Sequence, residues 1–154
     1  MKQKKNNRKK KAGNRKVVEK AGLAMKHGFH LEASWILSLA MERKLRKMIM
    51  WSGSPDPGAG FTLEQLVKRI KRLALASQGM EPVAQVPVAL IDRIRGWKNQ
   101  RNEILKDIPG IHVTPARLER LAKEGVNLYK SLNIAARSLK QTGNRPDQQK
   151  NNTD

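Results

Sequence analysis

The sequence predicts an all-α protein: an antiparallel bundle of four to five helices, with a disordered basic arm before it and a polar tail after it. In every long segment the apolar residues recur at spacings of three and four, the period of an amphipathic helix. Aromatic residues make up only 4% of the chain and β-branched residues are scattered, so no segment is typical of a strand. A chain of 154 residues is most simply one domain. We therefore expect an arm over residues 1–15, a bundle over 16–141 and a tail over 142–154.

The first helical region is predicted from about Lys16 to Trp51, with Gly28 as a joint. One face of this region repeats apolar residues at helical spacing and is expected to enter the core. Its members are Leu37, Met41, Leu45 and Met48, flanked by Trp35, Leu39 and Ile49.

The stretch SGSPDPGAG ends this helix, because two prolines and three glycines in nine residues do not continue one. A second helix is predicted to begin after Thr62, whose hydroxyl caps it while Gln65 reaches back to complete a capping box. This helix is expected to stop near Gly79.

Proline and threonine define the last two helices. Pro87 suits the first position of a third helix that runs to about Lys106. Thr114 as the cap and Pro115 as the first residue begin a fourth helix, which reaches Gln141. The short connections between the helices predict an antiparallel bundle.

Positive charge dominates the composition. The chain has 32 Lys and Arg against 13 Asp and Glu, a net charge of +19, and residues 17–154 alone still carry +10. Because each Lys or Arg placed beside a phosphate releases a condensed counterion, this excess favours an anionic partner. Nucleic acid is the first expectation and an anionic membrane surface the second; a soluble basic surface without a specific ligand is the third.

The sequence also argues against several classes of site. It has no cysteine, so it forms no disulfide and no thiolate zinc site, which fits a cytoplasmic protein. His27 and His30 lie three residues apart, but only Glu32 accompanies them, so we expect no metal and no cofactor. No apolar run reaches about 18 residues and none follows the basic arm, so neither a spanning helix nor a secretory signal is expected.

The third predicted helix carries one polar interruption in its core-facing stripe. Arg101 falls on this stripe, and an arginine inside a core is costly unless it is paired. We expect it where the stripe meets a groove, a partner subunit or an acidic residue, for which Glu42 is the candidate. The other members of the stripe are Leu90, Ile94, Trp97, Ile104 and Ile108.

The three tryptophans are predicted to differ in role. Trp35 and Trp97 fall on apolar stripes and are expected in the core. Trp51, at a helix end beside a loop, better suits a stacking or interface role.

The order of these segments resembles the HEPN superfamily (higher eukaryotes and prokaryotes nucleotide-binding). The resemblance lies in FHLEASWILSLAMERKLRKMI, a Pro/Gly loop, FTLEQLVKRI and a helix that contains RNEILKD, and it spans about Lys16 to Gln141. It implies a bundle of four to five helices. Active members of the family are metal-independent ribonucleases, many of them toxins or defence proteins, with a groove between two subunits.

The resemblance implies that Arg101 and Asn102 are the catalytic residues that hold the scissile phosphate. The histidine that active members carry four to six residues after the arginine falls here on Lys106, Asp107 or Ile108, and none of these is a histidine. A protonated lysine binds a phosphate but does not readily accept a proton. The chain therefore departs from the family pattern at the general base.

We predict a catalytically degenerate HEPN-like protein that binds RNA or another nucleic acid through a basic groove. Two alternatives stay open: an active ribonuclease with a shifted general base, and a non-catalytic interaction subunit in which Arg101 is structural. The expected assemblies are a homodimer and a complex with a cognate antitoxin or other partner protein. The predicted nucleic-acid contacts are Arg95, Lys98, Arg101, Asn102 and Lys106, with Lys9, Lys10 and Lys11 of the arm.

Overall fold

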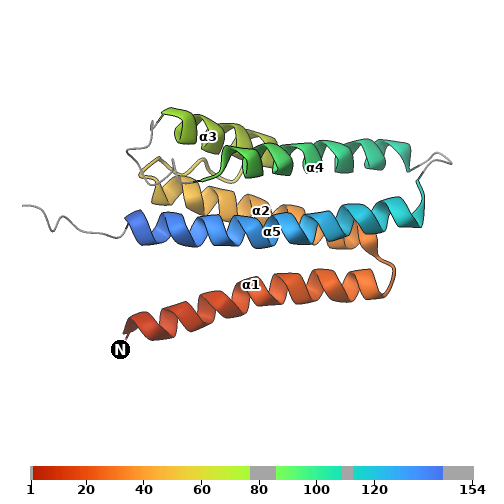
Figure 1. Ribbon diagram of the computed structural model, residues 1–154, viewed down its shortest axis with the longest axis horizontal. Helices are drawn as coiled ribbons and strands as arrows, with labels where there is room; N and C mark the ends of the chain where they lie inside the picture. Colours follow the sequence, from red (N-terminus) through yellow and green to blue (C-terminus); the bar gives the residue numbers. More distant parts are fainter. Residues whose placement is uncertain (1, 77–85, 109–112, 144–154) are drawn as a thin grey trace, which may run out of the picture.

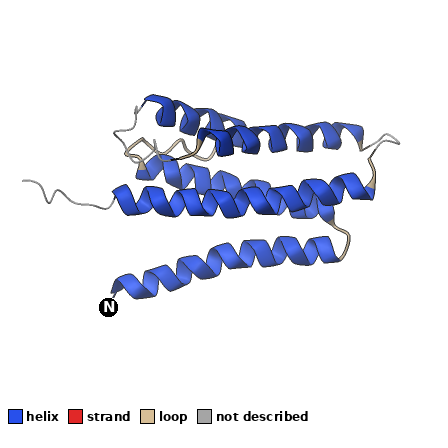
Figure 2. Cartoon of the chain, in the orientation of Figure 1, coloured by secondary structure: helices blue, strands red, loops and turns tan. Residues whose placement is uncertain are grey.

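The computed structural model describes residues 2–76, 86–108 and 113–143, with side chains from Gly13 onward (Figure 1). Within these ranges the chain is helix and loop without a strand, so the all-α class is confirmed (Figure 2). The structure has five helices: α1 (Lys2–Lys26), α2 (His30–Trp51), α3 (Leu63–Ala76), α4 (Val88–Asp107) and α5 (Pro115–Gly143).

Helix α2 lies at the centre of the bundle. It packs against α1, α3 and α5, while α4 closes the other side between α3 and α5. Helices α1 and α4 run in one direction along the long axis, and α2, α3 and α5 run in the other (Figure 1). The amphipathic helices thus bury their apolar faces in one shared core.

Local sequence signals place most helix ends where they were predicted. Gly28 adopts φ 79° in the joint between α1 and α2, a left-handed conformation that favours glycine. The capping box before α3 forms, with the Thr62 amide donating to Gln65 Oε1 at 2.8 Å. Before α5, the Arg117 amide donates to Thr114 Oγ1 at 3.2 Å.

Helix α1 begins much earlier than expected. Residues 2–15, predicted to be a disordered arm, continue the helix back to Lys2. Lysine, arginine and glutamine are good helix formers, and no proline interrupts them. Asn14 also ties this helix to the bundle, because its Oδ1 accepts hydrogen bonds from Lys44 Nζ at 3.0 Å and from Tyr129 Oη at 3.1 Å.

At the other end, α5 extends to Gly143, two residues into the predicted tail. The rest of the tail and the predicted end of the second helix near Gly79 lie outside the described residues.

The pair α2 and α3 is parallel, whereas an antiparallel neighbour was expected. The loop over residues 52–62 runs back alongside both helices. Arg46 Nη2 donates to the Phe61 carbonyl at 3.3 Å, and Arg69 Nη2 lies 3.5 Å from Ser54 Oγ at the other end of the loop. Eleven residues with two prolines are long enough to make this return, so α3 starts beside the middle of α2 rather than at its end.

The core contains most of the predicted apolar stripes, including Leu37, Met41, Ile94 and Trp97. Three members or flanking residues of the predicted stripes are exposed instead: Trp35, Leu39 and Ile108. The cause is the short helix α3. It pairs with α4 from Asp92, next to Lys71, to Lys98, next to Glu64. Among the described helices, none lies over the ends of α2 and α4 beyond that point on this side (Figure 1).

Residues of helices α2, α4 and α5 meet at Gly125. A β-carbon built there would lie 2.8 Å from the ring of Trp97 and 3.0 Å from Leu37 Cδ1. The Trp97 ring is held in place, because it is 1% exposed and its Nε1 donates to the Leu121 carbonyl at 2.8 Å. The tight contact therefore requires glycine.

We predict that Gly125→Ala lowers the free energy of unfolding by about 1–3 kcal/mol, because overpacking of a fixed ring outweighs the gain in helix propensity. Gly96→Ala on α4 is the matched control, since a β-carbon there meets nothing within 4 Å. That control should raise the free energy of unfolding by up to about 1 kcal/mol. Urea titrations of both variants measure the difference; equal stabilisation by both would contradict the close approach.

Candidate nucleic-acid interface

Arg101 enters the bundle as the helical periodicity predicted. It is 6% exposed, between the buried residues Trp97 and Ile104 of the same stripe. Its guanidinium carbon lies 4.8 Å from the centroid of the Trp35 ring. A cation over an indole face gains about 2 kcal/mol when it is removed from water. The π face of Trp35 is thus in contact with the positive charge of Arg101.

Glu42 also acts on Arg101, but from a distance. Burial lowers the pKa of Arg101 below its usual value, and the negative charge of Glu42 opposes this shift. No ion pair joins the two side chains among the described residues, and Arg101 Nε is buried without a hydrogen-bond partner. The expected Arg–Glu bridge is therefore a long-range attraction, and the side chain is held chiefly by packing.

Trp35 is the residue that sequence reasoning placed wrongly. It was expected in the core and is 55% exposed, with one face over Arg101 and the rest toward solvent. Leu39, one turn later on α2, is 40% exposed, and Ile108 after α4 is 45% exposed. We call Trp35, Leu39 and Ile108 the apolar face. No local signal distinguishes them from core residues, because their exposure depends on where α3 begins.

The other predicted contacts on α4 do not gather around Arg101. Arg95 and Lys106 are exposed, but eleven residues of helix separate them by about 16 Å along the axis. Asn102 is half-buried. Lys98 is largely buried and forms an ion pair with Glu64 of α3. The cations of α4 therefore do not form one groove within a single chain.

Lys9, Lys10 and Lys11 belong to the first half of α1, and their side chains lie outside the described part of the structure. The backbone of this segment is at the end of the bundle opposite the C-terminal part of α4 (Figure 1). The predicted arm and the predicted groove thus lie at different ends of the molecule.

The positions where the family histidine was expected offer no general base next to Arg101. Lys106 is exposed, and Asp107 Oδ2 lies 3.9 Å from Arg117 Nη1. His112 falls outside the described residues. His27 lies against Phe29, with ring centroids 6.4 Å apart.

His30 is at the start of α2, near Glu119 of α5. The pKa of Glu119 is lowered, first by the hydrogen bond and the charge of Lys123 and least by the electrostatic effect of His30. In the part of the chain that the structure describes, no three His, Asp or Glu side chains come together as metal ligands.

The other two tryptophans differ in burial. Trp97 is in the core. Trp51 is half-buried at the end of α2, and Lys140 Nζ of α5 lies 5.7 Å from its ring centroid. The contact joins the C-terminal ends of α2 and α5.

Sequence reasoning missed the basic residues of α2 and α3. Arg43, Lys47 and Arg72 are exposed, and no ion pair involves them among the described residues. A count of charge by half-helix would have found them, because residues 42–51 contain four basic side chains and one acidic one.

Comparisons of the chain with protein-family models, with curated proteins and with solved structures find no match. Among the described helices, none is both long and apolar enough to cross a membrane. The function is therefore inferred from the geometry and the charge of the chain itself.

Glu64 provides a pH-dependent contact between α3 and α4. Hydrogen bonds from Lys98 and Lys68, with the charges of both lysines, lower the pKa of Glu64 from 4.5 to about 2. A carboxyl with a depressed folded-state pKa stabilises the fold above its unfolded pKa and loses that contribution as pH falls through the folded value.

We predict that the wild-type protein is more stable than Glu64→Gln at neutral pH and that this advantage disappears between about pH 4.5 and pH 2. Melting temperatures from circular dichroism across this range measure the effect. Glu103→Gln, which removes an exposed carboxylate without a recorded ion pair in the described residues, is the control for net charge. Parallel pH profiles for wild type and Glu64→Gln would contradict the assignment.

Proposed function

We propose that this chain is a HEPN-like helical protein that binds RNA or another nucleic acid and does not cut it. The observation that carries the binding proposal is its excess of exposed basic side chains over carboxylates. The carboxylates of Glu19, Glu64, Asp92, Asp107 and Glu119 are already within ion-pair distance of a lysine or arginine. Many of the remaining described cations, such as Arg43, Lys47 and Arg72, are exposed to solvent, where a phosphate backbone is the partner that fits them.

Two observations support binding without cleavage. Arg101 is 6% exposed and covered by Trp35, so a phosphate does not reach its guanidinium unless the tryptophan moves. A lysine, Lys106, stands at a position of the family histidine, and a lysine ammonium group lacks the acceptor that a general base needs. In this proposal Arg101 is a packing residue, and the nucleic acid binds elsewhere.

We predict that the full chain binds single-stranded RNA with an affinity that falls steeply with salt, by a slope of about −0.7 for each phosphate contact, and leaves the RNA intact. Arg101→Ala should lower the free energy of unfolding by about 2 kcal/mol, because it removes the cation from the Trp35 ring, and should leave the RNA affinity of the folded protein unchanged. Filter binding, denaturing gels and urea titrations measure the three quantities.

RNA cleavage that disappears in Arg101→Ala would instead support an active ribonuclease. Salt-independent binding, or no binding, would contradict the proposal. Loss of RNA affinity in Arg101→Ala without loss of stability would show that the arginine contacts phosphate.

We also propose that the chain forms a homodimer through the apolar face. Trp35 and Leu39 lie one turn apart on α2. Ile108 lies two turns beyond Arg101 on the antiparallel helix α4, so along the axis Trp35 lies between Leu39 and Ile108 (Figure 1). Large apolar side chains exposed on successive turns of one helix, as at Trp35 and Leu39, are typical of a protein interface. The HEPN resemblance favours a second copy as the occupant, because the family forms its groove between two copies of the helix that carries the arginine, here α4.

We predict that the wild-type protein is a dimer in light scattering and that Leu39→Glu is a folded monomer, because it places a charge in the apolar face. Ile134→Glu is the matched control, since Ile134 is 65% exposed and lies on α5, outside this face. A monomeric wild type, or equal dissociation by both variants, would contradict the proposed interface.

A further inference from the structure

The positive charge is distributed unevenly along the bundle axis. In α2, residues 42–51 carry four basic side chains and one acidic one, whereas residues 30–41 carry one acidic side chain and no Lys or Arg. In α5, residues 130–143 carry three basic side chains and no acidic one, whereas residues 115–129 carry three basic and two acidic. Each helix is therefore more positive in its C-terminal half.

These halves lie at the same end of the molecule. Asn14, Lys44 and Tyr129 are hydrogen-bonded to one another through Asn14 Oδ1 and mark a common level on α1, α2 and α5. Beyond that level, Lys140 lies 5.7 Å from the ring of Trp51. The N-terminal end of α1 is also at this end (Figure 1), and residues 2–12 contain seven Lys or Arg and no acidic residue.

Helix α3 adds its charge to the same half. Its fourteen residues include four basic side chains and one acidic one, and that one, Glu64, is shared between Lys68 and Lys98. At the opposite end the excess of cations is smaller, because Asp107 pairs with Arg117 and Glu119 pairs with Lys123.

Five of these side chains form what we call the basic surface, which spans the C-terminal half of α2 and the adjoining helix α3. None of them is ion-paired within the described residues. Along each helix these side chains lie on the same or neighbouring turns. Between the two helices lies the 52–62 loop, which accepts a hydrogen bond from one arginine of each helix. The five are Arg43, Arg46, Lys47, Arg69 and Arg72.

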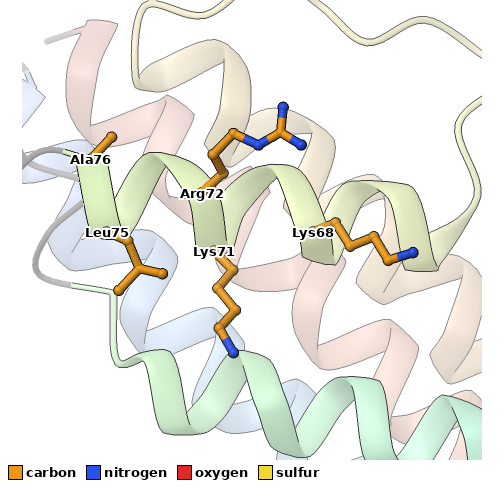
Figure 3. A pocket seen from close by; sticks show the side chains of 5 residues that line it. All are labelled: Lys68, Lys71, Arg72, Leu75 and Ala76. Atoms are coloured by element: carbon orange, nitrogen blue, oxygen red, sulfur yellow. The ribbon is translucent and has the colours of Figure 1, made fainter.

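The side chains of Lys71 and Arg72 on α3 extend in different directions, so Arg72 does not reach the carboxylate that binds Lys71 (Figure 3). In Figure 3, Lys71 extends toward α4, where its Nζ lies 2.6 Å from Asp92 Oδ1, while Arg72 extends away from α4. Arg46 and Arg69 use one donor each on neutral oxygen atoms of the loop. Their positive charges are therefore not neutralised by these contacts.

We propose that the basic surface, and not the Arg101 region, contacts the phosphates of the nucleic acid. This inference rests on the proposed function and assigns its location. Four of the five side chains are arginines, whose planar guanidinium can bind two phosphate oxygens at once. The exposed apolar side chains nearby, Met50 and Leu75, are single residues on separate helices and not the continuous stripe that a membrane-surface helix inserts.

The test compares two triple variants of the full chain that remove equal charge. Arg43→Gln/Lys47→Gln/Arg72→Gln changes the basic surface at exposed positions and leaves Arg46 and Arg69 on the loop. The control, Lys20→Gln/Lys26→Gln/Arg120→Gln, changes exposed cations without a recorded ion pair in the other half of the bundle. Circular dichroism establishes that both are folded.

Fluorescence anisotropy with a labelled single-stranded RNA, between low and moderate salt, gives the affinity and its salt slope. The basic-surface variant should reduce the magnitude of the slope by about 2 and weaken binding about a hundredfold at 0.1 M salt, as expected for three lost phosphate contacts. The control should retain the wild-type slope. This result would place the interface on α2 and α3.

Equal losses in the two triple variants would overturn the assignment and leave nucleic-acid binding intact. A larger loss of RNA affinity in Arg95→Gln/Lys106→Gln than in the basic-surface variant would also overturn the assignment, because it would place the interface on α4. Absence of RNA binding by the wild type, with binding to phosphatidylserine vesicles in its place, would overturn the proposed function as well.

Discussion

The contact among α2, α4 and α5 at Gly125 is the constraint on which the rest of the bundle depends. Glycine allows α5 to approach the Trp97 ring and Leu37 closely, and the indole N–H is satisfied by the Leu121 carbonyl in the same place. A large aromatic residue is thus buried without an unpaired donor. With these three helices fixed, α1 and α3 attach to the remaining faces of α2.

The second determinant of the architecture is the returning loop between α2 and α3. Because it uses eleven residues to fold back, α3 begins beside the middle of α2 and covers only part of the length of α2 and α4. Arg101 lies at the uncovered end, where Trp35 from α2 covers its charge. The position of this loop therefore determines both the exposure of the apolar face and the burial of Arg101. It also places the cations of α3 toward the opposite end of the bundle.

The sequence predicts features whose causes are local. The Gly28 joint, the Thr62–Gln65 box and the Thr114 cap each depend on a few adjacent residues, and all three form. The inward-facing position of Arg101 on its helix also follows from periodicity, although the Trp35 ring that covers it does not.

Tertiary arrangement decides what the sequence does not predict. Trp35 has the spacing of a core residue and is exposed because of a helix that begins near residue 63. For the candidate site, the motif identified the arginine but not its partner, because a tryptophan 66 positions earlier has no sequence relation to it. The proposed phosphate contacts were missed because they are spread over α2 and α3 and form no continuous motif.

The uneven distribution of cations gives the molecule an electric dipole along its long axis. Near a polyanion, such a dipole exerts a torque before any contact forms, so the protein approaches with its α3 end forward. Encounters then begin in a restricted set of orientations, which accelerates association at low ionic strength. The apolar face, near the trailing end of this axis, points away from the polyanion during approach and stays free to meet another protein surface.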